Sequence, residues 1–217
     1  ESAKEVGGDF FDTFMIDENR LGIVVADVSG KGVPAAMFMA ITRTLLRATA
    51  QSAASPAETV REVNQFLAAD NDQMMFVTLF HAVLDLSDGT FTYVNAGHNA
   101  PFRIAAEDVE PLARVGGPAL AVVEEMAYSQ EAITLTADTM VFAFTDGVTE
   151  AFSPDGEEFG SERLAKVIGA TGHVPPEELC KRVRQSVLAF EDGGEQADDV
   201  TCFALRYTGT AQTADTL

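Results

Sequence analysis

Acidic residues stand at the ends of strongly apolar segments in this chain of 217 residues. Asp27 follows residues 23–26, a run apolar enough for a strand that is buried on both faces. Gly30 and Gly32 then allow a tight turn, and Pro34 suits the first turn of a helix. A carboxylate on a rigid strand end could bind a hard metal ion or cap the following helix, and Asp27 alone fits both roles equally well.

The same arrangement recurs later in the chain. Residues 140–145 form a second apolar segment, which ends at Asp146 and is followed by a glycine and a short helical turn. Asp198 and Asp199 come directly before a last apolar strand. Repetition of one device within one chain favours a shared function over accident.

Asp9 belongs to the same set through a predicted hairpin. It precedes an aromatic strand over residues 10–16, and residues 17–20 have the composition of a turn. Asp9 lies about ten residues before the centre of that turn and Asp27 about nine after it, so antiparallel pairing brings them together. Strand alternation places Asp12 on the opposite face, where we expect a structural role.

Oxygen ligands without histidine pairs or a Cys-x-x-Cys motif disfavour zinc and suit Mg²⁺ or Mn²⁺. Converging carboxylates repel one another, and a cation resolves that repulsion. Two ions about 3.5–4 Å apart could hold a bridging water and clamp a phosphate. No Gly-x-Ser-x-Gly motif or P-loop consensus offers a competing chemistry.

The composition sets limits on partners and location. The formal charge of −20 argues against nucleic acid as a partner, because phosphate contacts need clustered Lys and Arg. No apolar run reaches membrane-spanning length, and the polar start lacks a signal-peptide pattern. The chain begins without Met, so we expect a domain of a longer protein. Cys180 and Cys202 make no disulfide framework, which favours a reducing, cytoplasmic setting.

The order of elements predicts the fold class. Strands are followed by two helices (33–52, and from the capping box of residues 55–58 to about 70), further strands, two more helices (161–170 and 176–190) and a last strand. This order predicts an α+β, four-layer α-β-β-α sandwich, in which two antiparallel sheets are flanked by helix pairs. We expect one domain over residues 1–217, with a flexible tail from about residue 208.

Two local predictions accompany this order. Residues 128–135 and 140–145 are expected to form a strand pair. The first two helices are expected to bury apolar stripes, made of Met37, Ala40, Ile41, Leu45 and Ala48 in one and Val60, Val63, Phe66 and Leu67 in the other.

Five segments occur in order, at residues 7–12, 26–32, 95–101, 144–151 and 198–201, and all but the third carry these acids. Together they closely resemble the bacterial branch of the metal-dependent PPM (PP2C-type) protein phosphatases, the branch named for SpoIIE and RsbU. The resemblance covers residues 6–207, and the ordered set is specific although each motif alone is weak. It implies hydrolysis of phosphoserine or phosphothreonine by a metal-activated water, with two divalent cations, Mn²⁺ or Mg²⁺.

The resemblance also implies roles for the acids. Asp27 resembles the bridging carboxylate, with the Val28 carbonyl as an extra ligand, and Asp9 resembles a ligand of the second metal. Asp146 and Asp198 resemble ligands of the first metal, and Asp27 and Asp146 would carry catalysis through the activated water. Asp199 stands in the adjacent position, where other branches have Asn.

The chain departs from eukaryotic relatives of this family in one respect. The arginine that binds phosphate in those relatives has no counterpart in this sequence. The metals would then hold the phosphate, with help from Lys31. His98 lies in a turn of small residues, where a structural role is commoner than ligation.

Members of this branch usually act on phosphorylated STAS-domain proteins and are fused to upstream sensor domains. The resemblance therefore implies a STAS-domain partner, a sensor in the parent chain, and a parent protein that is cytoplasmic or anchored in the inner membrane. The two helices after Asp27 occupy the place of a regulatory switch and could also form a homodimer. Two alternatives remain: a non-catalytic phosphatase-like module that binds a STAS protein, and a hydrolase of small phosphoesters.

Overall fold

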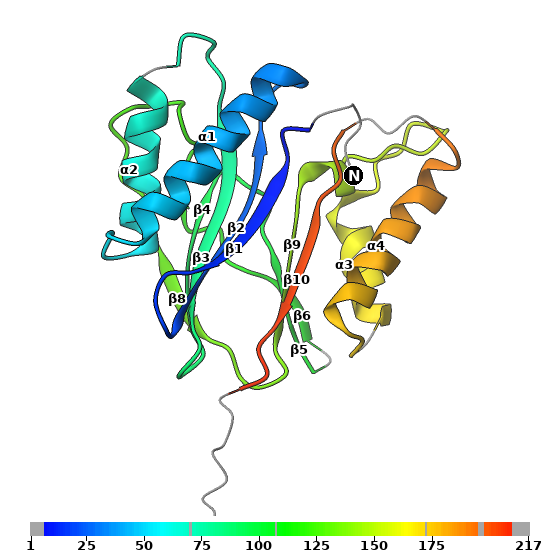
Figure 1. Ribbon diagram of the computed structural model, residues 1–217. Coiled ribbons are helices and arrows are strands. Elements are labelled where there is room, and N and C mark those ends of the chain that lie inside the picture. Colours follow the sequence, from blue (N-terminus) through cyan, green and yellow to red (C-terminus); the bar gives the residue numbers. More distant parts are fainter. Residues whose placement is uncertain (1–6, 70, 107, 172, 195–197, 210–217) are drawn as a thin grey trace, which may run out of the picture.

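The computed structural model describes residues 7–69, 71–106, 108–171, 173–194 and 198–209. Two β-sheets pack face to face, and a helix pair covers the outer face of each (Figure 1). The pair α1 (Val33–Ala50) and α2 (Pro56–Ala69) covers the first sheet, and α3 (Gly160–Thr171) and α4 (Pro176–Glu191) cover the second. The four-layer sandwich is confirmed. Most of the predicted flexible tail lies outside the described residues.

The first sheet has the order β1-β2-β3-β4-β7, and β8 also pairs with β4. Its strands are β1 (Phe10–Met15), β2 (Arg20–Val28), β3 (Val77–Asp85), β4 (Thr90–Ala96), β7 (Gly116–Gly117) and β8 (Glu131–Thr134). The second sheet has the order β10-β9-β5-β6, with β5 (Phe102–Ala105), β6 (Asp108–Pro111), β9 (Met140–Phe144) and β10 (Cys202–Arg206). Every pair is antiparallel except β4 with the two-residue β7.

The hairpin of β1 and β2 has the predicted register. Phe10 lies opposite Ala26, so continuing the ladder by one residue sets Asp9 opposite Asp27. Val24 and Ala26 pack under the helices, whereas Ile23 packs between the sheets. Because side chains alternate along a strand, Asp27 continues the face of Ile23 and points toward the second sheet.

One predicted strand pair is wrong. Segments 128–135 and 140–145 do not pair with each other: β8 joins β4 in the first sheet, and β9 lies between β10 and β5 in the second. Between them the chain makes a turn, closed by a hydrogen bond from the Thr139 amide to the Thr136 carbonyl, with Asp138 in the left-handed region. This turn takes the chain from one sheet to the other. The local sequence of such a turn does not differ from that of a hairpin turn within one sheet.

The buried face of α1 is also rotated from the prediction, by about 100°, or one residue. Met37 and Ile41 of the predicted stripe are 62% and 49% exposed, whereas Phe38, Thr42 and Leu46 are buried. The Thr42 hydroxyl donates to the Phe38 carbonyl at 2.8 Å. A threonine satisfied within its own helix can be buried, so hydropathy alone misplaces this face.

The stripe predicted for α2 is partly wrong. Val60, Val63 and Leu67 are buried, but Phe66 is 61% exposed. Half of the predicted capping box forms, since the Ser55 hydroxyl accepts from the Glu58 amide. The Glu58 carboxylate accepts instead from the Ala54 amide, one residue before the N-cap.

An ion pair ties α1 to the first sheet. Asp12, buried on the helix side of β1, accepts hydrogen bonds from Arg43 at 3.0 Å and from Arg47. Burial alone would raise the pKa of Asp12, but the hydrogen bonds from Arg47 and Arg43 outweigh it and lower that pKa. Asp12 therefore has a structural position away from the other acids, as the strand alternation predicts.

Cys180 and Cys202 are free thiols, in agreement with the absence of a disulfide framework, and burial raises their pKa values to about 11 and about 12. None of the described helices is long and apolar enough to cross a membrane.

Because the buried face of α1 includes Leu46 and excludes Ile41, two similar truncations should lower the free energy of unfolding by different amounts. Leu46→Ala should lower the free energy of unfolding by about 2–5 kcal/mol, because Leu46 is fully buried. Ile41→Ala, on the exposed face, should cost less than about 1 kcal/mol. Urea unfolding of both variants checks this, and equal losses would contradict the assigned face.

His81 in β3 predicts a pH-dependent loss of stability. Its side chain is fully buried, its Nδ1 lies 3.0 Å from the Ile23 carbonyl oxygen, and burial lowers its pKa to about 4 from 6.5. The unfolded chain therefore binds this proton more readily, so stability should fall as pH drops from 6.5 toward 4.

Relative to wild type, His81→Leu should remove about 2–3 kcal/mol of the loss between pH 7 and pH 4.5. His173→Leu, at an exposed position, is the matched control and should lose as much stability as wild type between the two pH values. Urea unfolding at pH 7 and at pH 4.5 measures the free energy of unfolding of each variant. A loss in His81→Leu equal to that of wild type would contradict the role assigned to His81.

Candidate metal centre

The predicted acids gather at one end of the sandwich. Asp9 and Asp27 stand where β1 begins and β2 ends, on the face toward the second sheet. Asp146 follows β9, and Asp198 and Asp199 precede β10, its antiparallel neighbour. Strands from both sheets thus deliver carboxylates to the same place, and the short 3₁₀ turn η1 (Asp146–Val148) begins there.

Asp9 and Asp27 form a close pair. Burial, followed in smaller measure by the charge of Asp27, raises the pKa of Asp9 to about 8. Burial also raises the pKa of Asp27 to about 6, with further contributions from the charges of Asp146, Asp198 and Asp199. Because the pKa values of both carboxyls are raised, the pair does not readily carry two full negative charges at once.

Asp146 shares the same environment. Its pKa is raised by burial first and by the charge of Asp198 second, while the Gly147 amide and Lys31 oppose the shift. The Lys31 ammonium lies 3.1 Å from Asp198 Oδ1. Lys31, predicted as a phosphate ligand, is thus at the cluster, where it pairs with a carboxylate.

Two glycines let the segments approach closely. The Gly8 amide donates to Asp199 Oδ2 at 2.9 Å, and a Cβ on Gly8 would lie 2.7 Å from the Val28 carbonyl oxygen. A Cβ on Gly147 would lie 2.0 Å from the Asp199 carbonyl oxygen. Both distances are too short for any side chain, so glycine is required where β2, η1 and the 198–199 segment meet.

Thr145 is a site residue that the sequence analysis missed. Its side chain is fully buried, and its hydroxyl donates to Asp9 Oδ2 and accepts from the Thr201 amide at 3.0 Å. It thereby links the acid of the first sheet to the strand ends of the second. A hydroxyl residue directly before a strand-end acid was the available signal.

The turn of residues 95–101 braces the two sheets next to the acids. His98 is buried, its Nδ1 lies 2.8 Å from Thr78 Oγ1, its amide donates to Asn95 Oδ1, and burial lowers its pKa to about 4. Asn99 donates to Thr149 Oγ1 at 3.3 Å. These contacts agree with the structural role expected for His98.

The donor set fits a hard divalent cation by its chemistry. Several carboxylates with raised pKa values, held by strands that cannot separate, gain stability from a positive charge between them. As they stand, no three Asp, Glu, His or Cys side chains within the described residues are close enough together to chelate an ion. Some carboxylates hydrogen-bond to protein groups instead, as Asp9 does to Thr145 and Asp199 to the Gly8 amide.

Comparison with known proteins identifies the family. The sequence model of the protein family described as Stage II sporulation protein E (SpoIIE) matches residues 17–208, which is most of the chain. The chain belongs to the SpoIIE family. It is 33% identical to Protein IcfG of Synechocystis, over 94% of this chain and 36% of that protein. It is 29% identical to the phosphoserine phosphatase RsbU of Bacillus subtilis, over 94% of this chain and 60% of that protein.

The solved structures agree on the fold. The SiaA-PP2C domain of Pseudomonas aeruginosa superposes with a TM-score of 0.85 at 20% identity, over 95% of this chain and 83% of that one. The SpoIIE-family chain therefore has a PP2C-like fold. It spans about a third of IcfG and three fifths of RsbU, so those proteins contain further sequence.

The close approach at Gly147 gives a prediction for this centre. Gly147→Ala would place a methyl group 2.0 Å from the Asp199 carbonyl and so push the 198–199 segment away from Asp146. We expect Mn²⁺ affinity, measured by calorimetry, to fall about 10-fold or more. Gly169→Ala in α3, with nothing within 4 Å, is the matched control and should bind Mn²⁺ like wild type. Unchanged affinity in Gly147→Ala would rule out a metal centre of this geometry.

Proposed function

We propose that this SpoIIE-family domain is a metal-dependent protein phosphatase that hydrolyses phosphoserine or phosphothreonine in bacterial signalling. The observation that carries the proposal is the gathering of Asp9, Asp27, Asp146 and Asp198 at one end of the sandwich, with burial and mutual charge raising the pKa of three of them. The naming of RsbU and RsbP, which is 24% identical, as phosphoserine phosphatases supports the same reaction.

The proposed role of each residue follows from its position at the centre. Two divalent cations, Mn²⁺ or Mg²⁺, would supply the charge that activates water and neutralises the phosphate. Asp27 would bridge them with help from the Val28 carbonyl, Asp9 would hold one, and Asp146, Asp198 and Asp199 would hold the other. Thr145 fixes the orientation of Asp9, and Lys31 would turn from Asp198 to the substrate phosphate.

The substrate in this proposal is a phosphorylated STAS-domain protein, and the domain is one part of a longer sensor-fused chain that is cytoplasmic or anchored in the inner membrane. The exposed face of α1 supports regulation through this helix. Val33, Met37 and Ile41 are 65%, 62% and 49% exposed, and Met74 beyond α2 is 86% exposed. A row of exposed apolar side chains is typical of an interaction surface, here for the upstream segment or a second copy.

The alternative, a non-catalytic module that binds a STAS protein, needs none of the acids at the centre. Their retention favours catalysis, because a cluster of mutually repelling carboxylates destabilises a fold that does not use it.

Substitution of two acids tests the reaction. With Mn²⁺, Asp27→Asn and Asp146→Asn should each lower phosphate release from a phospho-STAS protein by about 100-fold or more, since each removes a ligand from the centre. Asp108→Asn, exposed at the far end of β6, is the control and should match wild type. Both cluster variants should fold at least as stably as wild type, because a repelling charge is lost.

Activity that survives both cluster substitutions would refute the two-metal mechanism. Tight binding of the phospho-STAS protein by a wild-type domain that releases no phosphate would support the binding-module alternative.

A further inference from the structure

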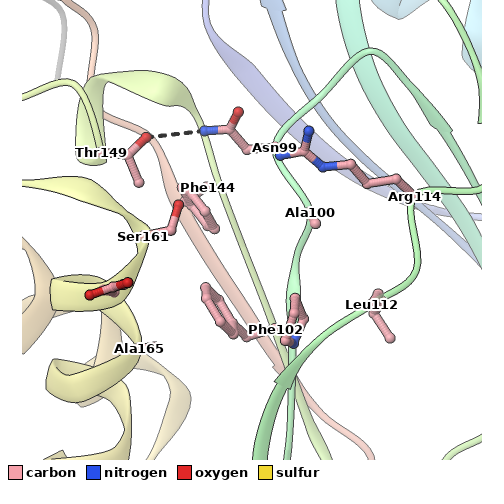
Figure 2. A pocket seen from close by; sticks show the side chains of 11 residues that line it. Asn99, Ala100, Phe102, Leu112, Arg114, Phe144, Thr149, Ser161 and Ala165 are labelled. Carbon is pink, nitrogen blue, oxygen red and sulfur yellow. Dashed lines mark hydrogen bonds between the residues drawn. The ribbon is translucent and has the colours of Figure 1, made fainter.

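A pocket of about 490 Å³ lies between the second sheet and the start of α3. Figure 2 shows its walls: Asn99 and Ala100 from the turn after β4, Thr149 from the segment after η1, and Ala165 from α3. The acidic centre does not use this pocket, so it needs an explanation of its own.

The pocket shares a wall with the centre. Thr149, which lines it, accepts from Asn99 Nδ2 and is hydrogen-bonded to the Asp146 carbonyl through its amide at 2.8 Å and its hydroxyl at 3.2 Å. Thr149 comes three positions after Asp146 along the 3₁₀ turn, a rise of about 6 Å. An extended chain covers that distance with about two residues. A peptide with its phosphoresidue at the centre can therefore reach the pocket with a residue close by in sequence.

The floor of the pocket is apolar. Phe102 and Phe144 are stacked with 6.0 Å between ring centroids, and Leu112 lies beside them; all three are buried. Rigid aromatic rings in a concave site bind an apolar side chain and bind a charged one poorly.

The rim carries one cation. The exposed Arg114 lines the mouth and extends toward Asn99 in Figure 2, and its side chain has no ion pair or hydrogen bond with any described residue. In a chain with a formal charge of −20, such a guanidinium offers a local site for an acidic group. Glu162 lies on the α3 side of the rim, so an acid is favoured only on the Arg114 side.

We infer that this pocket is a specificity subsite for the phosphoprotein substrate. It takes an apolar side chain within a few residues of the phosphorylated one, and Arg114 contacts an acidic group of the same segment. This inference rests on the proposed phosphatase function and adds the sequence preference around the phosphoresidue.

Short phosphoserine peptides test it. One Leu is moved through the positions on either side of phosphoserine in an alanine background, and a second series adds Asp next to the best Leu. With Mn²⁺, wild type should show a kcat/KM about 10-fold higher for Leu at one defined position than for the all-alanine peptide, through burial of that side chain. The added Asp should raise kcat/KM further.

Two variants test the contribution of the pocket independently of the metal centre. Ala165→Leu fills the pocket and should remove the Leu preference, and Arg114→Gln should remove only the Asp preference. Ala170→Leu, exposed at the end of α3, and Arg182→Gln, half-exposed in α4, are the matched controls and should keep both preferences.

The outcomes are distinct. Hydrolysis of p-nitrophenyl phosphate together with a flat peptide profile, or a Leu preference that persists in Ala165→Leu, would overturn the subsite and leave the phosphatase proposal standing. Failure to hydrolyse any peptide by a domain that still releases phosphate from a phospho-STAS protein would overturn the subsite alone. Failure to release phosphate from p-nitrophenyl phosphate, from any peptide and from the phospho-STAS protein would overturn the phosphatase proposal, and the subsite with it.

Discussion

Repulsion between carboxylates that cannot move apart is the constraint on which this structure depends. Asp27 is fixed by β2, whose residues 23–26 are almost wholly buried, and Asp146 is fixed by the fully buried β9. Neither strand can shift to separate its acid from the other without opening the core. The charge must therefore be balanced at the site, by protons, by protein donors such as Thr145 and Lys31, or by bound cations.

The close backbone contacts follow from the same constraint. To bring strand ends of two different sheets to one point, the connecting segments must approach within contact distance, and Gly8 and Gly147 are where they do so. The hydrogen bonds of Thr145 and the Gly8 amide then join the two sheets through the site itself. The centre is thus part of what holds this end of the sandwich together.

Much of this could be predicted from the sequence because it depends on local counting. The β1–β2 register follows from the position of one turn, and the strand-end placement of Asp146 from the apolar run before it. The face of α1 could not be predicted, because it depends on the burial of Thr42 and on the pairing of Asp12 with Arg47, which lies 35 residues away. The role of Thr145 depends on Asp9, 136 residues away, and the exchange of sheets between β8 and β9 is equally non-local.

The connections of α1 define how a regulatory signal on this helix would reach the centre. At its start, Gly30 and Gly32 have φ values of 89° and 79°, and a Cβ added to either would meet nothing within 4 Å, so this turn can change conformation at little steric cost. Further along, Arg43 and Arg47 tie α1 to Asp12 in β1, the strand that Asp9 precedes. Both arginines are nearly half exposed, so the ion pair is weaker than the apolar packing beneath it. A displacement of α1 would therefore alter the glycine turn and the position of Lys31 before it altered β1 or β2, which makes the side of the centre near Asp198 the responsive one.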